Sequence, residues 1–318
     1  MTPIPAIRPD VQKFLDLLAA NPRPKMSNDN IASLRPLAAG GMALIDRPIG
    51  ELAITTDHVI AGPGGDLALR LFDCRNTREA GPIVVFFHGG GFVIGDLDTH
   101  ASMCAEISRS LDLPVVAVGY RLAPENPWPA APDDAEAGAR WVAANAAVLG
   151  RTSTGIVLCG DSAGATLTLV TALALRDTPA EVPVIGQIAL YPGADTHGEY
   201  ASKDLFATGF GLDRSDTVWF GEAYGQPADH WRAAPLHADL KGVAPTVLVT
   251  AELDPLRDQG RAYAAKLVQA GVETTFREVR GQIHGFANYR RVIASAHDDF
   301  VSVLAVAKAS LLDQVPLA

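Results

Sequence analysis

Short apolar runs rich in β-branched residues recur along the chain from residue 83 onward, and longer Ala-rich amphipathic stretches separate them. These runs predict strands at residues 83–87, 115–118, 155–159, 187–190, 246–250 and 275–279. Helices are predicted between them, as in the stretches from Asp133 to Leu149 and from Asp258 to Gly271. Strands that are apolar throughout and alternate with helices indicate a parallel sheet covered on both faces. The expected fold class is therefore α/β, with functional side chains gathered at the carboxyl ends of the strands.

Two regions fall outside this alternation. Residues 1–45 are predicted to form one or two helices, and a pair of strands near residues 52–60 and 67–72 follows them. Residues 194–235 separate two sheet strands and are far longer than an ordinary connection. We predict that residues 1–45 and 194–235 pack together as a helical cap. Residues 46–193 and 236–318 would then form the main α/β domain.

Composition and charge exclude several classes of protein. The 26 Lys and Arg residues against 36 Asp and Glu give a formal charge of −10, which argues against a nucleic-acid partner. Cys74, Cys104 and Cys159 are odd in number and lack metal-ligand spacing, so neither a disulfide framework nor a metal site is expected. No signal peptide or apolar run of about eighteen residues is visible, which predicts a cytoplasmic protein without stable membrane insertion. The oligomeric state stays open, although exposed edges of such sheets often pair in a homodimer.

Three consecutive glycines, Gly89 to Gly91, follow the apolar run at residues 83–87 and His88. Because glycine loses more backbone entropy on folding than other residues, three in a row should serve a close approach or a sharp bend. A phosphate-binding loop is one explanation. However, the stretch lacks both the Lys-Ser/Thr of a P-loop and the G-x-G-x-x-G spacing of a dinucleotide fold. The alternative is that these N–H groups face a charge that develops during a reaction.

A G-x-S-x-G pentapeptide with Ser162 at its centre lies at a predicted strand-to-helix transition. A serine nucleophile needs a base and an orienting acid, and two further residues follow later strands at the same edge of the sheet. Asp254 follows the strand near Thr250, and His284 follows the last predicted strand. The chain order Ser, Asp, His is that of α/β-hydrolases. An ordinary Ser N-cap is the alternative for the pentapeptide alone, but the full constellation favours a serine hydrolase.

The motifs HGGGF, YRLAPE, GDSAG, DPLRD and HGF occur here in that order. From about residue 45 to the C-terminus the chain resembles the bacterial hormone-sensitive-lipase-like esterases, which are carboxylic ester hydrolases of the α/β-hydrolase fold with a helical cap. The resemblance implies Ser162 as nucleophile, Asp254 as acid and His284 as base, with no metal and no cofactor. Gln282, where the family commonly has a hydrophobic residue, is a departure, as are Ala165 and Thr166 after the nucleophile motif.

The resemblance also implies an oxyanion hole formed by Gly89, Gly90 and Ala163, with Gly91 permitting the turn. Aromatic side chains are expected either to line an acyl pocket or to form the core of the cap: Phe92, Phe206, Phe210, Trp219 and Phe220. Asp161 is expected to accept hydrogen bonds from nearby backbone N–H groups, Glu125 to anchor its own loop, and His100 to lie either at the surface or behind the site.

The expected function is hydrolysis of short- to medium-chain acyl esters, a small-molecule substrate class, through an acyl-enzyme. A deacetylase, amidase or thioesterase would use the same residues. A non-catalytic binding protein on this fold is a further alternative, but it is disfavoured by the complete set of Ser162, Asp254 and His284.

Overall fold

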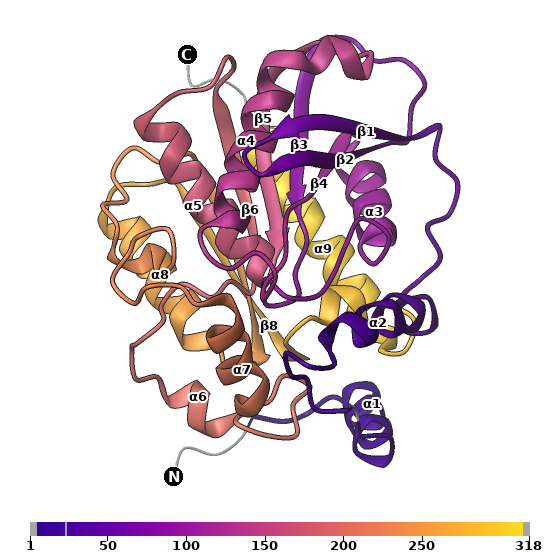
Figure 1. The fold of residues 1–318 in the computed structure, drawn as a ribbon, viewed down its shortest axis with the longest axis vertical. Helices are drawn as coiled ribbons and strands as arrows, with labels where there is room; N and C mark the ends of the chain where they lie inside the picture. The colour runs from indigo at the N-terminus through magenta and orange to yellow at the C-terminus, as the bar shows by residue number, and fades with distance from the viewer. Residues whose placement is uncertain (1–4, 23, 314–318) are drawn as a thin grey trace.

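The computed structural model describes residues 5–22 and 24–313, which form a mixed sheet flanked by helices (Figure 1). The strands are β1 (Ile54–Gly62), β2 (Gly65–Asp73), β3 (Gly81–Phe87), β4 (Val115–Gly119), β5 (Ser153–Asp161), β6 (Val184–Leu190), β7 (Thr246–Leu253) and β8 (Thr274–Ile283). The helices are α1 (Pro9–Ala20), α2 (Ile31–Ile45), α3 (Ala101–Leu111), α4 (Ala130–Asn145), α5 (Ala163–Asp177), α6 (Ala201–Leu205), α7 (Arg214–Tyr224), α8 (Arg257–Gln269) and α9 (Ala294–Leu311). Short 3-10 turns lie at Ala146–Leu149, Pro235–His237 and Phe286–Asn288.

The strand order in this eight-stranded sheet is β1-β2-β4-β3-β5-β6-β7-β8. β2 pairs antiparallel with both β1 and β4, whereas the pairs from β4 through β8 are all parallel. Each of the six strands predicted from residue 83 onward lies within one of β3 to β8, and the early pair is the β1–β2 hairpin. The prediction of a mostly parallel α/β sheet is confirmed.

The two faces of the sheet bury alternate residues of each central strand. In β3, Val84 and Phe86 pack with α3 and α9, while Ile83, Val85 and Phe87 pack with α4 and α5 on the other face. α8 extends the second layer over β7. Because both faces are covered by helices, the central strands are apolar over most of their length, which explains their apolar runs in the sequence. The loops at the carboxyl ends of β5, β7 and β8 carry the side chains described below.

The helices outside the βα alternation, α1, α2, α6 and α7, gather in the lower half of the view in Figure 1. Arg8, at the start of α1, pairs with Asp299 of α9 at 2.5 Å. The N–H of Ser202 in α6 donates to Asp258 of α8. The segment with α1 and the segment with α6 are therefore both attached to the helices of the α/β layers by hydrogen bonds that involve side chains. Within the described part of the chain, no helix is both long and apolar enough to cross a membrane.

Candidate active site

Ser162 lies on a sharp turn between β5 and α5. Its backbone has φ 52° and ψ −118°, a region that costs a non-glycine residue strain. The turn is tight because a Cβ at Gly160 would lie 2.3 Å from the carbonyl oxygen of Gly164, and one at Gly164 would lie 1.9 Å from that of Phe87. The glycines of the pentapeptide are thus required by close backbone contacts. The serine hydroxyl is raised at the carboxyl end of β5.

The structure brings Ser162, His284 and Asp254 together from three different strand ends. The Nε2 atom of His284 lies 2.8 Å from the Oγ atom of Ser162. Its Nδ1 atom lies 2.8 Å from Asp254 Oδ2. Asp254 is fully buried, and its Oδ1 atom accepts a hydrogen bond from the N–H of Leu256 at 2.7 Å. The carboxylate is therefore fixed on one side by its own loop and on the other by the imidazole.

The imidazole of His284 is also held by an aromatic contact that sequence reasoning did not find. Tyr191, directly after β6, has φ 42° and lies edge-on to the ring of His284 at a centroid distance of 4.9 Å. The tyrosine is buried, and burial raises the pKa of its hydroxyl well above the ordinary value. The phenol therefore stays neutral and limits rotation of the imidazole. The only indication in the sequence is that this tyrosine directly follows a buried strand, and many residues at such positions have no role in an active site.

Asp161, the residue before Ser162, is buried and joins two loops of the site. Its Oδ1 atom accepts the N–H of Gly89 at 2.7 Å, and its Oδ2 atom accepts the side-chain amide of Asn288 at 3.0 Å. The Nε2 atom of His100 lies 3.4 Å from Oδ1. The prediction that Asp161 serves nearby backbone N–H groups is confirmed. One carboxylate thus connects the glycine loop, the serine turn and the loop after His284.

The charge of this buried carboxylate is balanced by its neighbours. Burial alone raises the pKa of Asp161, but His100 and the N–H of Gly89 outweigh burial, so the pKa lies below the ordinary value. His88 stacks on Tyr120 at 4.2 Å, and burial followed by repulsion from His100 lowers the pKa of His88 to about 4. Asp161 is therefore ionised and His88 neutral near pH 7.

The glycine loop, residues 89–95, differs in one respect from the prediction. The N–H of Gly89 is already used by Asp161, so this glycine is poorly placed to donate to an oxyanion. The N–H groups of Gly90 and Gly91 have no acceptor among the described residues. A Cβ at Gly90 would lie 2.1 Å from the carbonyl oxygen of Ile94, and one at Gly91 would lie 2.5 Å from the ring of Phe220. Each glycine is thus required by a different close contact.

The aromatic residues singled out from the sequence separate into two groups. Phe206 is fully buried, in edge contact with Phe210 at 5.0 Å and beneath the guanidinium of Arg257 at 5.1 Å. These contacts place Phe206 in the packed core, so we do not expect it to touch a substrate. Phe210 is 9% exposed and lies at the edge of the same core.

The second aromatic group surrounds the glycine loop. Phe92 has φ 64° and stacks on Tyr224 of α7 at 3.9 Å. Phe220, also on α7, covers Gly91, and Trp219 lies beside it at 5.6 Å. Phe92, Trp219 and Phe220 are partly exposed. Phe92 and Phe220 lie next to Gly91, one of the two glycines whose N–H groups have no acceptor in the described chain. An apolar surface beside the glycine loop therefore comes from α7 and Phe92.

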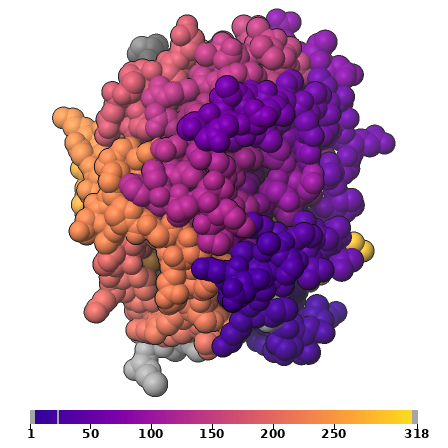
Figure 2. Space-filling view, in the orientation of Figure 1, coloured from indigo at the N-terminus to yellow at the C-terminus, as the bar shows by residue number. Residues whose placement is uncertain are grey.

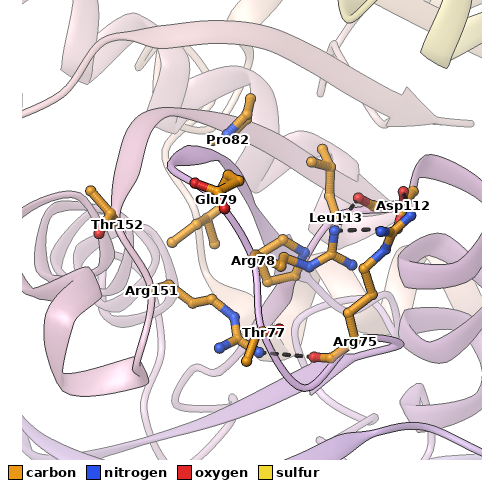
Figure 3. Close-up of a pocket in the computed structure, with 12 residues that line it drawn as sticks. Arg75, Thr77, Arg78, Glu79, Pro82, Asp112, Leu113, Arg151 and Thr152 are labelled. Carbon is orange, nitrogen blue, oxygen red and sulfur yellow. Dashed lines mark hydrogen bonds and ion pairs between the residues drawn. The ribbon is translucent and has the colours of Figure 1, made fainter.

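A cavity of about 430 Å³ lies elsewhere (Figure 3). It borders the start of β3, at the opposite end of that strand from the glycine loop. Three arginines line it, but Arg78 and Arg151 pair with buried Asp73 and Arg75 pairs with Asp112. Since the guanidinium groups are already paired with carboxylates, this cavity offers no free charge to a ligand. The Ser–His–Asp arrangement is the better candidate for chemistry.

A strained serine turn, a histidine and a buried aspartate in this chain order define an α/β hydrolase with serine-type active-site geometry. A family model described as alpha/beta hydrolase fold matches residues 84–288. The chain belongs to this family, among the hormone-sensitive-lipase-like esterases, which confirms the resemblance inferred from the motifs.

Three relatives illustrate the similarity. Carboxylic ester hydrolase LipN of Mycobacterium tuberculosis is 40% identical over 73% of this chain, which spans only 64% of LipN. Carboxylesterase NlhH of the same species is 34% identical and matches 98% of this chain and 99% of its own length. The solved structure of a hyperthermophilic esterase from Pyrobaculum calidifontis superposes with a TM-score of 0.88 at 33% identity, covering 95% of this chain and 98% of that chain.

Proposed function

We propose that the protein hydrolyses carboxylic esters through an acyl-enzyme formed on Ser162. The observation that carries this proposal is the pair of 2.8 Å contacts that link Ser162 to His284 and His284 to Asp254. The ester-hydrolase names of the relatives support the same chemistry. The proposed steps use only protein groups and water.

In the first step the Oγ atom of Ser162 attacks the ester carbonyl carbon while Nε2 of His284 accepts the hydroxyl proton. Asp254, bound to Nδ1, holds the imidazole in the required tautomer and stabilises the imidazolium. The tetrahedral intermediate then collapses, the alcohol leaves with the proton from His284, and the acyl group stays on the serine. Water enters, gives a proton to His284 and attacks the acyl carbon. The second tetrahedral intermediate collapses as His284 returns this proton to the Oγ atom of Ser162, which releases the carboxylic acid.

We propose that the oxyanion is bound by Gly90, Gly91 and Ala163, which replaces Gly89 of the sequence prediction with Gly91. The support is that Gly89 donates to Asp161, whereas Gly90 and Gly91 have no acceptor in the described chain. Ala163 begins α5, where the first N–H groups have no intrahelical partner. Losing one donor of such a hole typically costs about 2.7–4 kcal/mol of transition-state stabilisation.

We further propose that α1 and α2, together with α6 and α7, form a cap over this site. The contact of Phe220 with Gly91 supports a role of α7 in enclosing the acyl group. Phe92, Trp219 and Phe210 would contribute apolar surface. An enclosed apolar site of this kind favours short- to medium-chain acyl groups over long ones.

A chain-length series of p-nitrophenyl esters, measured beside matched p-nitroanilides, tests the function and its substrate range. We expect the highest kcat/KM between the acetate and the hexanoate, because the aromatic cap limits the length of the acyl group. The anilides should be hydrolysed far more slowly than the esters. A maximum beyond decanoate would refute the chain-length proposal, and faster hydrolysis of the anilides would assign the site to an amidase.

Replacing Asp161 with Asn should lower kcat by about 10- to 10³-fold, because the glycine loop would lose its fixed position. The carboxylate accepts one N–H on each oxygen, from Gly89 and from Asn288. An Asn amide has one acceptor and one donor group and serves only one of them.

The double variant D161N/N288D is the matched control, because it restores a donor–acceptor pair between the two side chains and keeps the net charge. We expect this variant to recover part of the lost kcat while the KM of each variant stays close to that of the wild type. A kcat of D161N equal to the wild type would contradict the positioning role of Asp161.

A further inference from the structure

Arg35, on α2, reaches out of the N-terminal helix and binds the loop that follows the triple glycine. Its Nε atom donates to the carbonyl oxygen of Val93 at 2.8 Å, and its Nη2 atom donates to that of Ala123 at 2.7 Å. The same guanidinium pairs with Glu125 through two further hydrogen bonds of 2.9 and 2.7 Å. Glu125 thus anchors its loop, as the sequence suggested, and does so through a residue 90 positions earlier.

The two carbonyl acceptors belong to segments that hold the glycine loop in shape. The carbonyl oxygen of Gly90 accepts the N–H of Val93 at 3.0 Å, which closes the turn on which Gly91 lies. The N–H of Ala123 donates to the carbonyl oxygen of Phe92 at 2.9 Å. Arg35 therefore bridges two loop segments that are hydrogen-bonded to each other. Because Val93 and Ala123 are fully buried, the guanidinium supplies hydrogen bonds to carbonyl oxygens that water does not reach.

Helix α2 has few other attachments to the main domain near this point. Ile31 is its only buried residue within the described chain, and Leu37 and Leu44 are each 69% exposed. Its far end is held where Asp46 binds the buried Arg290. A helix that buries little apolar surface depends strongly on its polar contacts. The space-filling view shows the indigo N-terminal segment directly against the magenta surface of the main domain (Figure 2).

We propose that Arg35 is a positioning residue for the oxyanion hole: the seating of α2 sets the direction of the Gly90 and Gly91 N–H groups. The inference rests on the proposed ester hydrolysis and adds a coupling between the N-terminal helix and the catalytic step. When the guanidinium bridges Val93 and Ala123, the turn after Gly90 is held in one shape. When α2 moves away, the turn loses this support and the hole loses its geometry.

If α2 and Arg35 served only to enclose the substrate, the Arg35 variants would show a different change in kinetic constants. Enclosure by α2 would act on the acyl chain, so its loss would raise KM and would do so more for the hexanoate than for the acetate. Positioning of the oxyanion hole acts on every ester equally, since each substrate develops the same charge on its carbonyl oxygen. The ratio of the effects on two chain lengths therefore separates the two roles.

The test compares the R35A and R35K variants with E125Q as the matched control. We expect R35A to lose about 10²-fold in kcat on both acetate and hexanoate esters with KM little changed, as for a misplacement of about 1 Å. R35K should lose most of the same activity, because one ammonium group does not reproduce the planar fork that reaches both carbonyls. E125Q keeps these two hydrogen bonds and removes only an exposed ion pair, so its kcat should stay within about twofold of the wild type.

Two further measurements keep the test decisive. Added guanidinium ion should restore part of the kcat of R35A, and the same additive should not raise the activity of the wild type or E125Q. The inhibition constant of an alkylboronic acid, which places an oxygen in the hole after adding to Ser162, should rise in R35A by the factor lost in kcat/KM. Thermal unfolding of each variant, followed by circular dichroism, identifies any variant that is not folded. If R35A is not folded, the kcat and KM of R35K decide between the two roles.

The inference is overturned if R35A and R35K keep wild-type kcat, or if only KM changes and does so in proportion to chain length. Failure of the proposed function is recognised separately. In that case the wild type itself hydrolyses no ester, and the boronic acid does not bind to any variant.

Discussion

Replacing Ser162 with alanine is expected to lower kcat for p-nitrophenyl butyrate by about 10⁵- to 10⁶-fold, because no other hydroxyl replaces the nucleophile. The Oγ atom of Ser162 lies 2.8 Å from Nε2 of His284. In the alanine variant the imidazole has no hydroxyl to activate, and no group is present to accept the acyl group. Residual rate above the uncatalysed reaction should remain, since the N–H groups of the hole are untouched. Initial rates measure the loss of kcat and the residual rate. The mass increase after reaction with a fluorophosphonate shows whether a serine nucleophile is present.

The control for Ser162→Ala is Ser153→Ala, which removes a hydroxyl at the opposite end of β5. Ser153 Oγ donates only to the carbonyl oxygen of Gly155, so its loss should leave kcat unchanged and the fluorophosphonate adduct intact. The wild type and S153A should each gain one adduct, and S162A none. An S162A protein that still forms the adduct, or turns over at a rate near that of the wild type, would show that another residue is the nucleophile.

The sheet was predictable because each of its central strands is buried on both faces. The buried run at residues 156–159 of β5 is apolar at every position, so its sequence differs plainly from the amphipathic helices beside it. The three residues Ser162, Asp254 and His284 were predictable for a related reason. Each follows a strand directly, and the carboxyl ends of parallel strands meet at one edge.

Helix boundaries were less predictable where tertiary contacts override local propensity. One or two helices were expected within residues 1–45 without defined ends, and α2 continues through Gly40 and Gly41 to Ile45. Both glycines face open space, so no close contact requires them. Beyond them, the N–H of Arg291 donates to the carbonyl oxygen of Ile45 and Asp46 binds Arg290, which secures the last turn. Those partners lie about 250 residues away and leave no local pattern.

The same limit explains the oxyanion hole and the contacts behind it. Three glycines in a row indicate close approach, but they do not say which N–H groups are already used. Gly89 is excluded only because Asp161, 72 positions later, accepts its hydrogen bond. Arg35 was missed because its acceptors lie 58 and 88 positions away. An arginine on an exposed helix looks, in sequence, like any solvated side chain.

Replacing Asp254 with asparagine is expected to lower kcat by about 10⁴-fold at neutral pH while the fold and KM are retained. The local hydrogen bonds determine this outcome. Oδ1 of Asp254 accepts the N–H of Leu256, so an asparagine must keep its oxygen there and point its NH₂ group at Nδ1 of His284. An NH₂ donor facing Nδ1 forces the proton of the neutral imidazole onto Nε2. That tautomer donates toward Ser162 and is unable to accept its proton. Rates measured beside the ¹⁵N spectrum of labelled histidine test both the loss and its cause.

Asp258→Asn is the matched control, because Asp258 is a second carboxylate only four residues later, in the first turn of α8. Its oxygens bind the N–H of Ser202 and the guanidinium of Arg257, not His284. Asparagine keeps an acceptor for Ser202, so D258N should lose less than about tenfold in kcat, with no change in the histidine tautomer. If D258N were the more damaged variant, or if D254N kept the tautomer protonated on Nδ1, Asp254 would not be the residue that orients the base. The difference between two aspartates four positions apart thus measures the effect of contact with the imidazole, separately from loss of a carboxylate charge nearby.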